Sequence, residues 1–179
     1  EGSAEPNLAV APDGFVLSWL EETGPGRHAL RFAHLGPGGW SEPGTVMERE
    51  DLFVNWADFP SLLALEDGTL AAHWLEKSGP GTYAYDVRTA LSSDGGRSWS
   101  PDIIPHRDGL EAEHGFVSLF PVADAPAGPD GQAPRVGAVW LDGRETDEGR
   151  PMTLRFAAIG PDGASGDALL DPDVCDCCQ

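Results

Sequence analysis

The sequence holds little that would place the protein in a membrane or on a nucleic acid. No apolar run reaches the length of about 18 residues that a transmembrane helix needs. Lys and Arg number only 11 against 30 Asp and Glu, and the formal net charge is −19. Nucleic acids and anionic membrane surfaces are bound by basic faces, so this composition argues against both as partners.

Cysteine is also scarce and is confined to one end of the chain. All 3 cysteines, Cys175, Cys177 and Cys178, lie among the final residues. The rest of the chain therefore folds without disulfides, and the odd count leaves at least one thiol without an internal partner. Thiolates with His114 nearby would suit Zn²⁺ or Cu⁺. The alternatives to a metal site are disulfides to a missing part of the protein, or inert thiols. Because these alternatives need no metal, the sequence does not require a cofactor.

Long helix-period segments are absent, and short apolar segments repeat instead. Gly (23 residues) and Pro (16 residues) separate these segments, which is typical of strands joined by turns. Three of the segments are alike, each with tryptophan at its fifth position: Phe15–Glu22, Leu70–Lys77 and Val136–Gly143. A second segment containing an arginine follows each of them, at Arg31, Arg88 and Arg155. The chain is therefore a threefold internal repeat.

Each repeat predicts one four-stranded antiparallel sheet. Asp-Gly between two apolar runs, as at Asp13-Gly14 and Asp67-Gly68, is a strong hairpin signal. Four strands repeated at about 60 residues are typical of β-propeller blades. We therefore expect an all-β fold of three blades. The expected ranges are 1–50, 51–108 and 109–172, with 173–179 beginning a fourth blade, and the weak last strands fall at 43–47, 102–105 and 168–170.

The most specific motif lies between the third and fourth strands of the second repeat. Residues 92–99 match Ser/Thr-x-Asp-x-Gly-x-x-Trp, the Asp box, through Ser92, Asp94, Gly96 and Trp99. Asp caps such a turn, Gly supplies the left-handed conformation and Trp packs back on the blade. The chain thus resembles the Asp-box (BNR-repeat) superfamily, whose best known members are six-bladed bacterial sialidases. The resemblance implies a structural Asp box and about half of such a propeller.

The expected strand order brings several candidate site residues to one end of the fold. Segments just before the first strand and just after the second strand of each repeat meet there, around the central channel, and form a dense set of titratable and aromatic groups. The expected substrate contacts are Trp56, Glu76, His114 and Asp142, and the expected catalytic residues are Asp58 and Arg144.

The catalytic roles come from the resemblance. Sialidases use an arginine cluster for the substrate carboxylate, a tyrosine nucleophile assisted by glutamate, and an aspartate acid/base. By position Asp58 would be the acid, or else it caps a turn. Arg144 would bind the carboxylate, or else it forms a salt bridge with Asp142 or Glu145. The family's Phe/Tyr-Arg-Ile-Pro segment is absent, and the nucleophile would fall in later blades.

The expected function follows from this partial resemblance. We expect a piece of a secreted or periplasmic propeller that binds glycans or acts as an exo-glycosidase of the sialic-acid type. A propeller with a Cys/carboxylate metal site and no catalysis, or a protein-interaction platform, is the alternative. Open blade edges would favour self-association, and two copies closing one ring is a further possibility.

Overall fold

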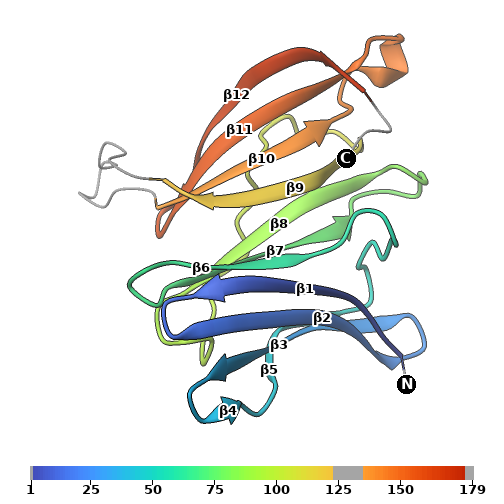
Figure 1. Ribbon diagram of the computed structural model, residues 1–179. Coiled ribbons are helices and arrows are strands. Elements are labelled where there is room, and N and C mark those ends of the chain that lie inside the picture. Colours follow the sequence, from blue (N-terminus) through green and yellow to red (C-terminus); the bar gives the residue numbers. More distant parts are fainter. Residues whose placement is uncertain (1, 123–134, 176–179) are drawn as a thin grey trace. The chain divides into compact units, whose positions relative to one another are not determined.

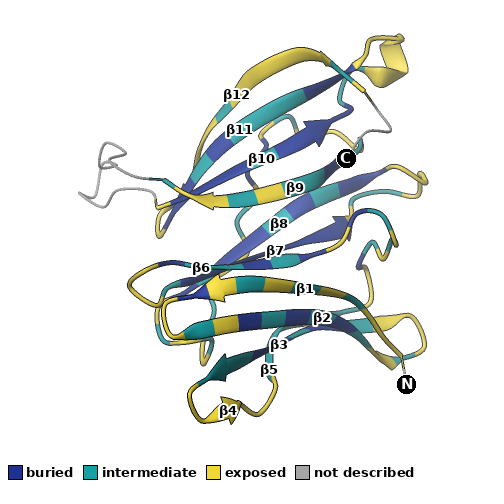
Figure 2. Cartoon of the chain, viewed as in Figure 1, coloured by how far each residue is buried: buried dark blue, intermediate teal, exposed yellow. Residues whose placement is uncertain are grey.

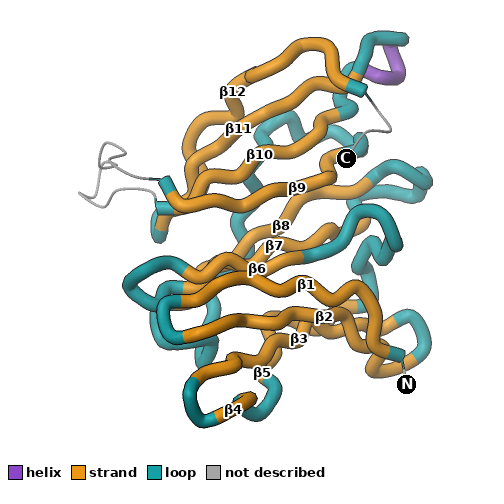
Figure 3. The backbone as a smooth tube through the Cα atoms, viewed as in Figure 1, coloured by secondary structure: helices purple, strands orange, loops and turns teal. Residues whose placement is uncertain are grey.

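The computed structural model describes residues 2–122 and 135–175, which form antiparallel β-sheets joined by turns (Figure 1). The prediction of an all-β protein is confirmed. Within the described chain the helical content is a single 3₁₀ turn, Thr146–Glu148, between β10 (Val136–Asp142) and β11 (Met152–Gly160) (Figure 3). No helix of these residues has the length and hydropathy to cross a membrane.

The chain divides into two compact units. Unit 1 comprises Glu1–Trp74 and Thr89–Asp102, and unit 2 comprises Leu75–Arg88 and Ile103–Gln179. The division passes through β7 (Leu70–Lys77) and β8 (Tyr85–Ser92), so these two strands contribute residues to both units.

The first sheet lies in unit 1 and follows the first repeat. Its strands are β1 (Ser3–Ala11), β2 (Gly14–Gly24), β3 (Arg27–Gly36), β4 (Gly39–Trp40) and β5 (Gly44–Arg49). Ala11 pairs with Gly14 across a tight hairpin. A Cβ at Gly14 would lie 1.9 Å from the Leu35 carbonyl oxygen, so only glycine fits at this position. Both β4 and β5 pair with β3, which gives this sheet five strands.

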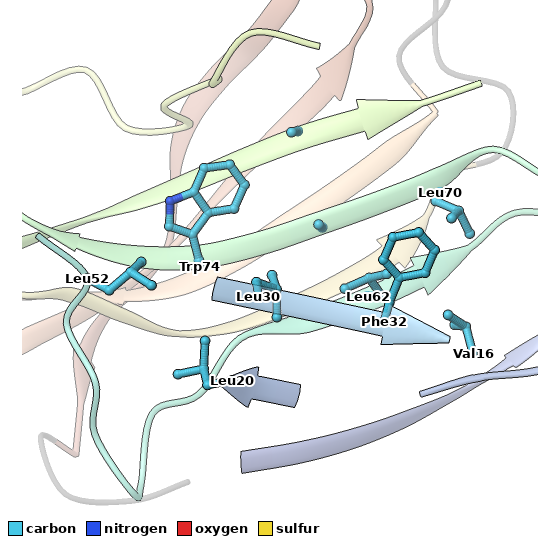
Figure 4. Close-up of a cluster of buried hydrophobic side chains, with 10 residues drawn as sticks. Val16, Leu20, Leu30, Phe32, Leu52, Leu62, Leu70 and Trp74 are labelled. Atoms are coloured by element: carbon cyan, nitrogen blue, oxygen red, sulfur yellow. The ribbon is translucent and has the colours of Figure 1, made fainter. Parts of the chain in front are cut away.

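The core of unit 1 is apolar. Figure 4 shows eight of its side chains, which come from β2, β3, the second repeat and the segment before it: Val16, Leu20, Leu30, Phe32, Leu52, Leu62, Leu70 and Trp74. Alternate residues of β2 point into this core, because successive side chains of a strand face opposite sides of the sheet. Burial of these side chains is the main favourable term in the folding of unit 1.

The second sheet has three strands: β6 (Ser61–Ala64), β7 and β8. The prediction of a fourth strand at 102–105 is wrong, because the structure has no strand there. Pro101 and Pro105 enclose this segment, and a proline has no N–H to donate to a neighbouring strand. The three-blade prediction of four strands in every sheet therefore fails at this sheet.

The Asp box forms a tight turn in unit 1, directly after β8. Asp94 Oδ1 accepts hydrogen bonds from Ser92 Oγ (2.8 Å) and the Ser98 backbone N–H (2.9 Å), and Asp94 Oδ2 accepts one from Ser98 Oγ (2.7 Å). The hydrogen bonds from Ser98 and Ser92 lower the pKa of Asp94 to about 2. The Trp99 ring meets Phe32 edge to face, with centroids 5.9 Å apart. These contacts give the motif a structural role within unit 1.

The third sheet lies in unit 2 and has four strands, in the order β12-β11-β10-β9. They are β9 (His114–Pro121), β10 (Val136–Asp142), β11 (Met152–Gly160) and β12 (Gly163–Val174). β12 is much longer than the expected strand at 168–170, and Val174 still pairs with Met152. Figure 2 shows β10 buried along most of its length, whereas most of β12 is exposed.

Candidate functional site

Each repeat pairs the arginine of its third strand with an acidic residue two positions after the tryptophan. The N–O distances are 3.3 Å for Arg31–Glu21, 3.0 Å for Arg88–Glu76 and 3.9 Å for Arg155–Asp142. Such diagonal pairs are within reach across neighbouring strands. The acidic side chain is 38% exposed at Glu21, 9% at Glu76 and 0% at Asp142. The same pair is therefore partly solvated in the first repeat and buried in the third.

Asp142 is the centre of a buried polar network in unit 2. It is the last residue of β10, and both of its carboxylate oxygens are occupied. Oδ2 accepts hydrogen bonds from Trp140 Nε1 (2.8 Å) and Arg144 Nη2 (2.7 Å), and Oδ1 accepts one from Arg144 Nε (2.7 Å). Charged donors of this kind are what a carboxylate needs in order to remain ionised without water.

Arg144 is held by three carboxylates. Besides Asp142, it donates two 3.1 Å hydrogen bonds to Asp167, and its Nε lies 2.9 Å from Asp108 Oδ2. Burial opposes the charge of Arg144, but these carboxylates outweigh burial and raise its pKa. Arg155 also donates to Asp167, at 3.0 Å. A ligand carboxylate at Arg144 would compete with these three carboxylates.

Two histidines stack inside the same network. The rings of His106 and His114 are parallel within 1°, with centroids 3.8 Å apart, and their side chains are 3% and 0% exposed. A parallel bridge between Tyr85 and Glu113 joins β8 to the start of β9 and sets the position of His114. Its Nδ1 lies 3.1 Å from the Tyr85 carbonyl oxygen, and its Nε2 lies 3.0 Å from Asp108 Oδ2. His106, in the loop after β8, has no hydrogen-bond partner for either ring nitrogen among the described residues.

The pKa values of the two histidines are shifted in opposite directions. Burial, followed by the charge of His114, lowers the pKa of His106 to about 4. Burial also disfavours the charged form of His114, but the hydrogen bond to Asp108 and the charge of Asp142 outweigh it and raise the pKa of His114. The pKa shifts of the two stacked rings are therefore opposite in direction, downward for His106 and upward for His114.

Asp86 and Asp108 face opposite edges of this pair. Asp86 Oδ1 lies 3.7 Å from His106 Nε2 and 3.8 Å from His114 Nδ1. On the other edge, Asp108 Oδ1 lies 3.4 Å from His106 Nδ1. The connected ion pairs contain five carboxylates, of Glu76, Asp86, Asp108, Asp142 and Asp167, and three guanidinium groups, of Arg88, Arg144 and Arg155. Before the histidines are counted, this network therefore has two more negative than positive charges.

A pocket of about 710 Å³ opens beside Arg144 in unit 2. The lining includes Tyr83, Glu111, Glu113, Arg144, Asp147 and Glu148. The Tyr83 side chain is largely exposed, with 64% of the residue surface accessible. The Tyr85 hydroxyl donates a 2.8 Å hydrogen bond to Glu113 and so fixes the direction of that carboxylate. The pocket combines one aromatic ring with four carboxylates and a single cation among its lining residues.

The predicted site residues fall into both units. Glu76, His114, Asp142 and Arg144 belong to unit 2, and all four are members of the buried network. Trp56 and Asp58 belong to unit 1, where Trp56 is 87% exposed and Asp58 is 4% exposed. Burial and the charge of Asp58 raise the pKa of Glu5 to about 7.

Several members of the network were not predicted from the sequence. They are Asp86, His106, Asp108 and Asp167, together with Arg155, which the sequence identified only as a repeated arginine. The His-x-Asp spacing of residues 106 and 108 was the one available signal, and it is too common in loops to stand alone. Of the cysteines, Cys175 follows β12 and is exposed, whereas Cys177 and Cys178 lie outside the described residues. A metal site at these cysteines stays a prediction.

The sequence matches no protein-family model and no curated protein. Among solved structures, the chain is similar to a protein of unknown function from Dyadobacter fermentans, with a TM-score of 0.55 and 16% sequence identity. The similarity covers 94% of this chain and 55% of that chain, so the present chain spans about half the length of its neighbour. At this identity the likeness concerns the fold alone.

Proposed function

We propose that the protein recognises a carbohydrate and that the sugar binds in the pocket of unit 2. The observation that carries the proposal is that the exposed Tyr83 ring lines a pocket of about 710 Å³. Four acidic residues line the same pocket: Glu111, Glu113, Asp147 and Glu148. Pyranose rings pack their C–H faces on aromatic side chains, and their hydroxyl groups donate to carboxylates. A few oriented polar groups in a concave pocket are what fixes such a ligand.

The resemblance to Asp-box proteins supports the same proposal. The turn at Ser92, Asp94, Gly96 and Trp99 has the hydrogen bonds that the motif needs. We place the three sheets in a propeller of this kind, in which loops at one end of the blades form the ligand site. Fold likeness alone does not determine chemistry, so the proposal depends on the pocket.

The charge of the pocket bears on which sugar binds. Arg144 is the one cation among its lining residues, and its guanidinium group is occupied by Asp142, Asp108 and Asp167. A sialic-acid carboxylate would meet four acidic side chains and one guanidinium group that already binds three carboxylates. We therefore expect neutral sugars to bind better than sialylated ones.

The test is a glycan array followed by calorimetry with the best ligand. Tyr83→Ala should weaken binding at least tenfold, because it removes the aromatic surface on which the sugar packs. Trp40→Ala is the matched control, since Trp40 is an exposed aromatic residue of unit 1 and should leave the affinity unchanged. Failure of the folded protein to bind any glycan would refute the proposal. Binding of sialylated glycans only would refute the preference for neutral sugars.

A further inference from the structure

His106 is a buried imidazole that has carboxylates nearby but no hydrogen bond within the described residues. Its side chain is 3% exposed, and neither ring nitrogen has a hydrogen-bond partner among the described residues. An unsatisfied buried donor or acceptor lowers stability, and His106 has one of each in its neutral form. Natural proteins seldom retain such a group without a use for it.

The distances around His106 Nε2 match the spacing of metal ligands. Asp86 Oδ1 is 3.7 Å from His106 Nε2 and 3.8 Å from His114 Nδ1, and all three atoms lie within 4.8 Å of one another. These separations exceed a direct hydrogen bond, and they are shorter than the roughly 4.6 Å that a bridging water spans with two 2.8 Å bonds. Two ligand atoms each about 2.1 Å from one ion, at an angle of about 120°, lie about 3.6 Å apart.

The opposite edge of the histidine pair supplies the expected support. Ligating histidines usually donate their other ring N–H to a carboxylate, which fixes the ring and strengthens the ligand. Asp108 stands at that edge, with Oδ2 3.0 Å from His114 Nε2 and Oδ1 3.4 Å from His106 Nδ1. Asp108 therefore hydrogen-bonds His114 and lies close to His106, while Asp86 faces His106 Nε2 and His114 Nδ1, of which Nδ1 contacts the Tyr85 carbonyl oxygen.

The charge of the network favours a cation at the same place. Five carboxylates and three guanidinium groups leave two negative charges in excess, and one divalent cation would neutralise them. Asp142 and the Asp108 Oδ2 atom are already engaged by Arg144. Asp86 pairs with Arg88 through Oδ2, at 3.6 Å, and its Oδ1 atom faces the two histidines. The edge that faces Asp86 is therefore the better one for an ion.

We propose that Asp86, His106 and His114 bind one divalent transition-metal ion, with Asp108 as the carboxylate that orients both histidines. Two imidazole nitrogens and one carboxylate oxygen suit ions such as Zn²⁺, Co²⁺ and Fe²⁺, and leave positions for water or a substrate. The parallel rings must tilt toward each other at this edge. His114 Nδ1 then faces the ion and releases the proton that it shares with the Tyr85 carbonyl oxygen. This site is independent of the carbohydrate pocket and of the cysteines.

The experiment titrates Co²⁺ into the chelator-treated, untagged protein and follows visible d–d absorption and calorimetric heat. One equivalent should bind. His106→Gln should weaken binding at least 100-fold and Asp86→Asn at least tenfold. Two matched controls should keep full affinity: His28→Gln, a histidine of β3 in unit 1, and Asp162→Asn, an exposed carboxylate in the turn between β11 and β12 of unit 2. Circular dichroism of each variant checks that it is folded.

The cysteines provide the competing explanation, and a variant with Cys175, Cys177 and Cys178 changed to Ser separates the two. Retention of one Co²⁺ equivalent in that variant, with loss in Asp86→Asn, supports the histidine site. Loss of binding in the Ser variant together with full binding in His106→Gln overturns the proposal. The absence of Co²⁺ and Zn²⁺ binding by the folded protein overturns it as well.

Discussion

Units 1 and 2 use equivalent positions of the repeat in different ways. In unit 1, the carboxylate of Glu21 is 38% exposed and pairs with Arg31, while the interior is made of Leu30, Phe32, Trp74 and other apolar side chains. In unit 2, the equivalent carboxylate of Asp142 has no exposed surface and joins Trp140 and Arg144 inside the fold. The acidic position two residues after the tryptophan thus lies at the surface in unit 1, as Glu21, and at the centre of the buried network in unit 2, as Asp142.

This difference shows how one buried charge recruits others. Removing a carboxylate from water is expensive unless charged hydrogen bonds replace the water, so Asp142 needs Arg144. Arg144 loses its own hydration and takes Asp108 and Asp167 as further partners. Replacing such a network by apolar residues is often neutral or stabilising, so stability alone is a weak reason to retain it. A ligand at the histidine pair is a better reason.

The largest expected effect comes from removing the carboxylate at the centre of unit 2. Asp142→Asn keeps the shape of the side chain but leaves Arg144 with a buried, partly uncompensated charge. We expect a loss of about 3–5 kcal/mol in the free energy of unfolding, measured by urea denaturation. Glu21→Gln, at the equivalent position of the first repeat, should cost less than about 1 kcal/mol, because exposed ion pairs contribute little. Equal losses for the two variants would show that the two positions do not differ in their energetics.

A second pair of variants tests the apolar interior of unit 1. A Cβ on Gly96 would lie 2.2 Å from the Phe32 ring, at a φ of +85° that favours glycine. Gly96→Ala should therefore cost about 2–4 kcal/mol, from overpacking and from the left-handed backbone together.

The neighbouring residue is the matched control. Gly95 also has a positive φ, +73°, but a Cβ there would have nothing within 4 Å. Gly95→Ala should cost only about 1 kcal/mol, the backbone contribution alone. Thermal unfolding of the two variants separates the steric part from the conformational part, and similar losses would rule out a packed contact between the Asp box and Phe32.

The strands were predictable where the repeat was regular. The tryptophan segments became β2, β7 and β10, and the arginine segments became β3, β8 and β11. The prediction failed where local composition overrode the repeat. Pro101, just before the expected strand at 102–105, and Pro105, its last residue, disfavoured the last strand of the second sheet. The strand β12 extends well past its expected bounds. The pattern of apolar residues identifies a strand more reliably than it fixes the end of that strand.

The functional cluster was only partly predictable, because its members come from loops and strand ends far apart in the sequence. His114 was recognised because it lies just before the expected first strand of its repeat. Asp142 and Arg144 were recognised because they lie just after the expected second strand. Asp86 looked like an ordinary strand residue and His106 like an ordinary loop residue. No spacing rule reveals that these two side chains approach each other within 3.7 Å. Such proximity depends on the packing of separate segments.

The smallest expected effect concerns the buried histidine of unit 1, which contrasts with the histidine pair of unit 2. His73 lies in β7, is 1% exposed and contacts Ser61 Oγ at 3.1 Å. Burial outweighs its hydrogen bond to the Phe59 backbone and lowers its pKa from 6.5 to about 4. Between about pH 6.5 and pH 4, His73 therefore binds a proton in the unfolded chain but not in the folded chain. Stability should fall as pH falls, by about 2 kcal/mol between pH 6.5 and 5 from this residue.

His73→Asn isolates that contribution, because asparagine can still contact Ser61 but has no proton to gain in this range. The difference in unfolding free energy between wild type and variant, measured by urea denaturation at each pH, should shrink from pH 6.5 to pH 5. Taking the difference cancels Glu5, whose raised pKa of about 7 gives unit 1 the opposite trend, a loss of stability as pH rises from 4.5. A constant difference across this range would mean that His73 gains its proton equally in the folded and unfolded chain. Burial in unit 1 would then leave the pKa of His73 unshifted, in contrast to the raised pKa of His114 in unit 2.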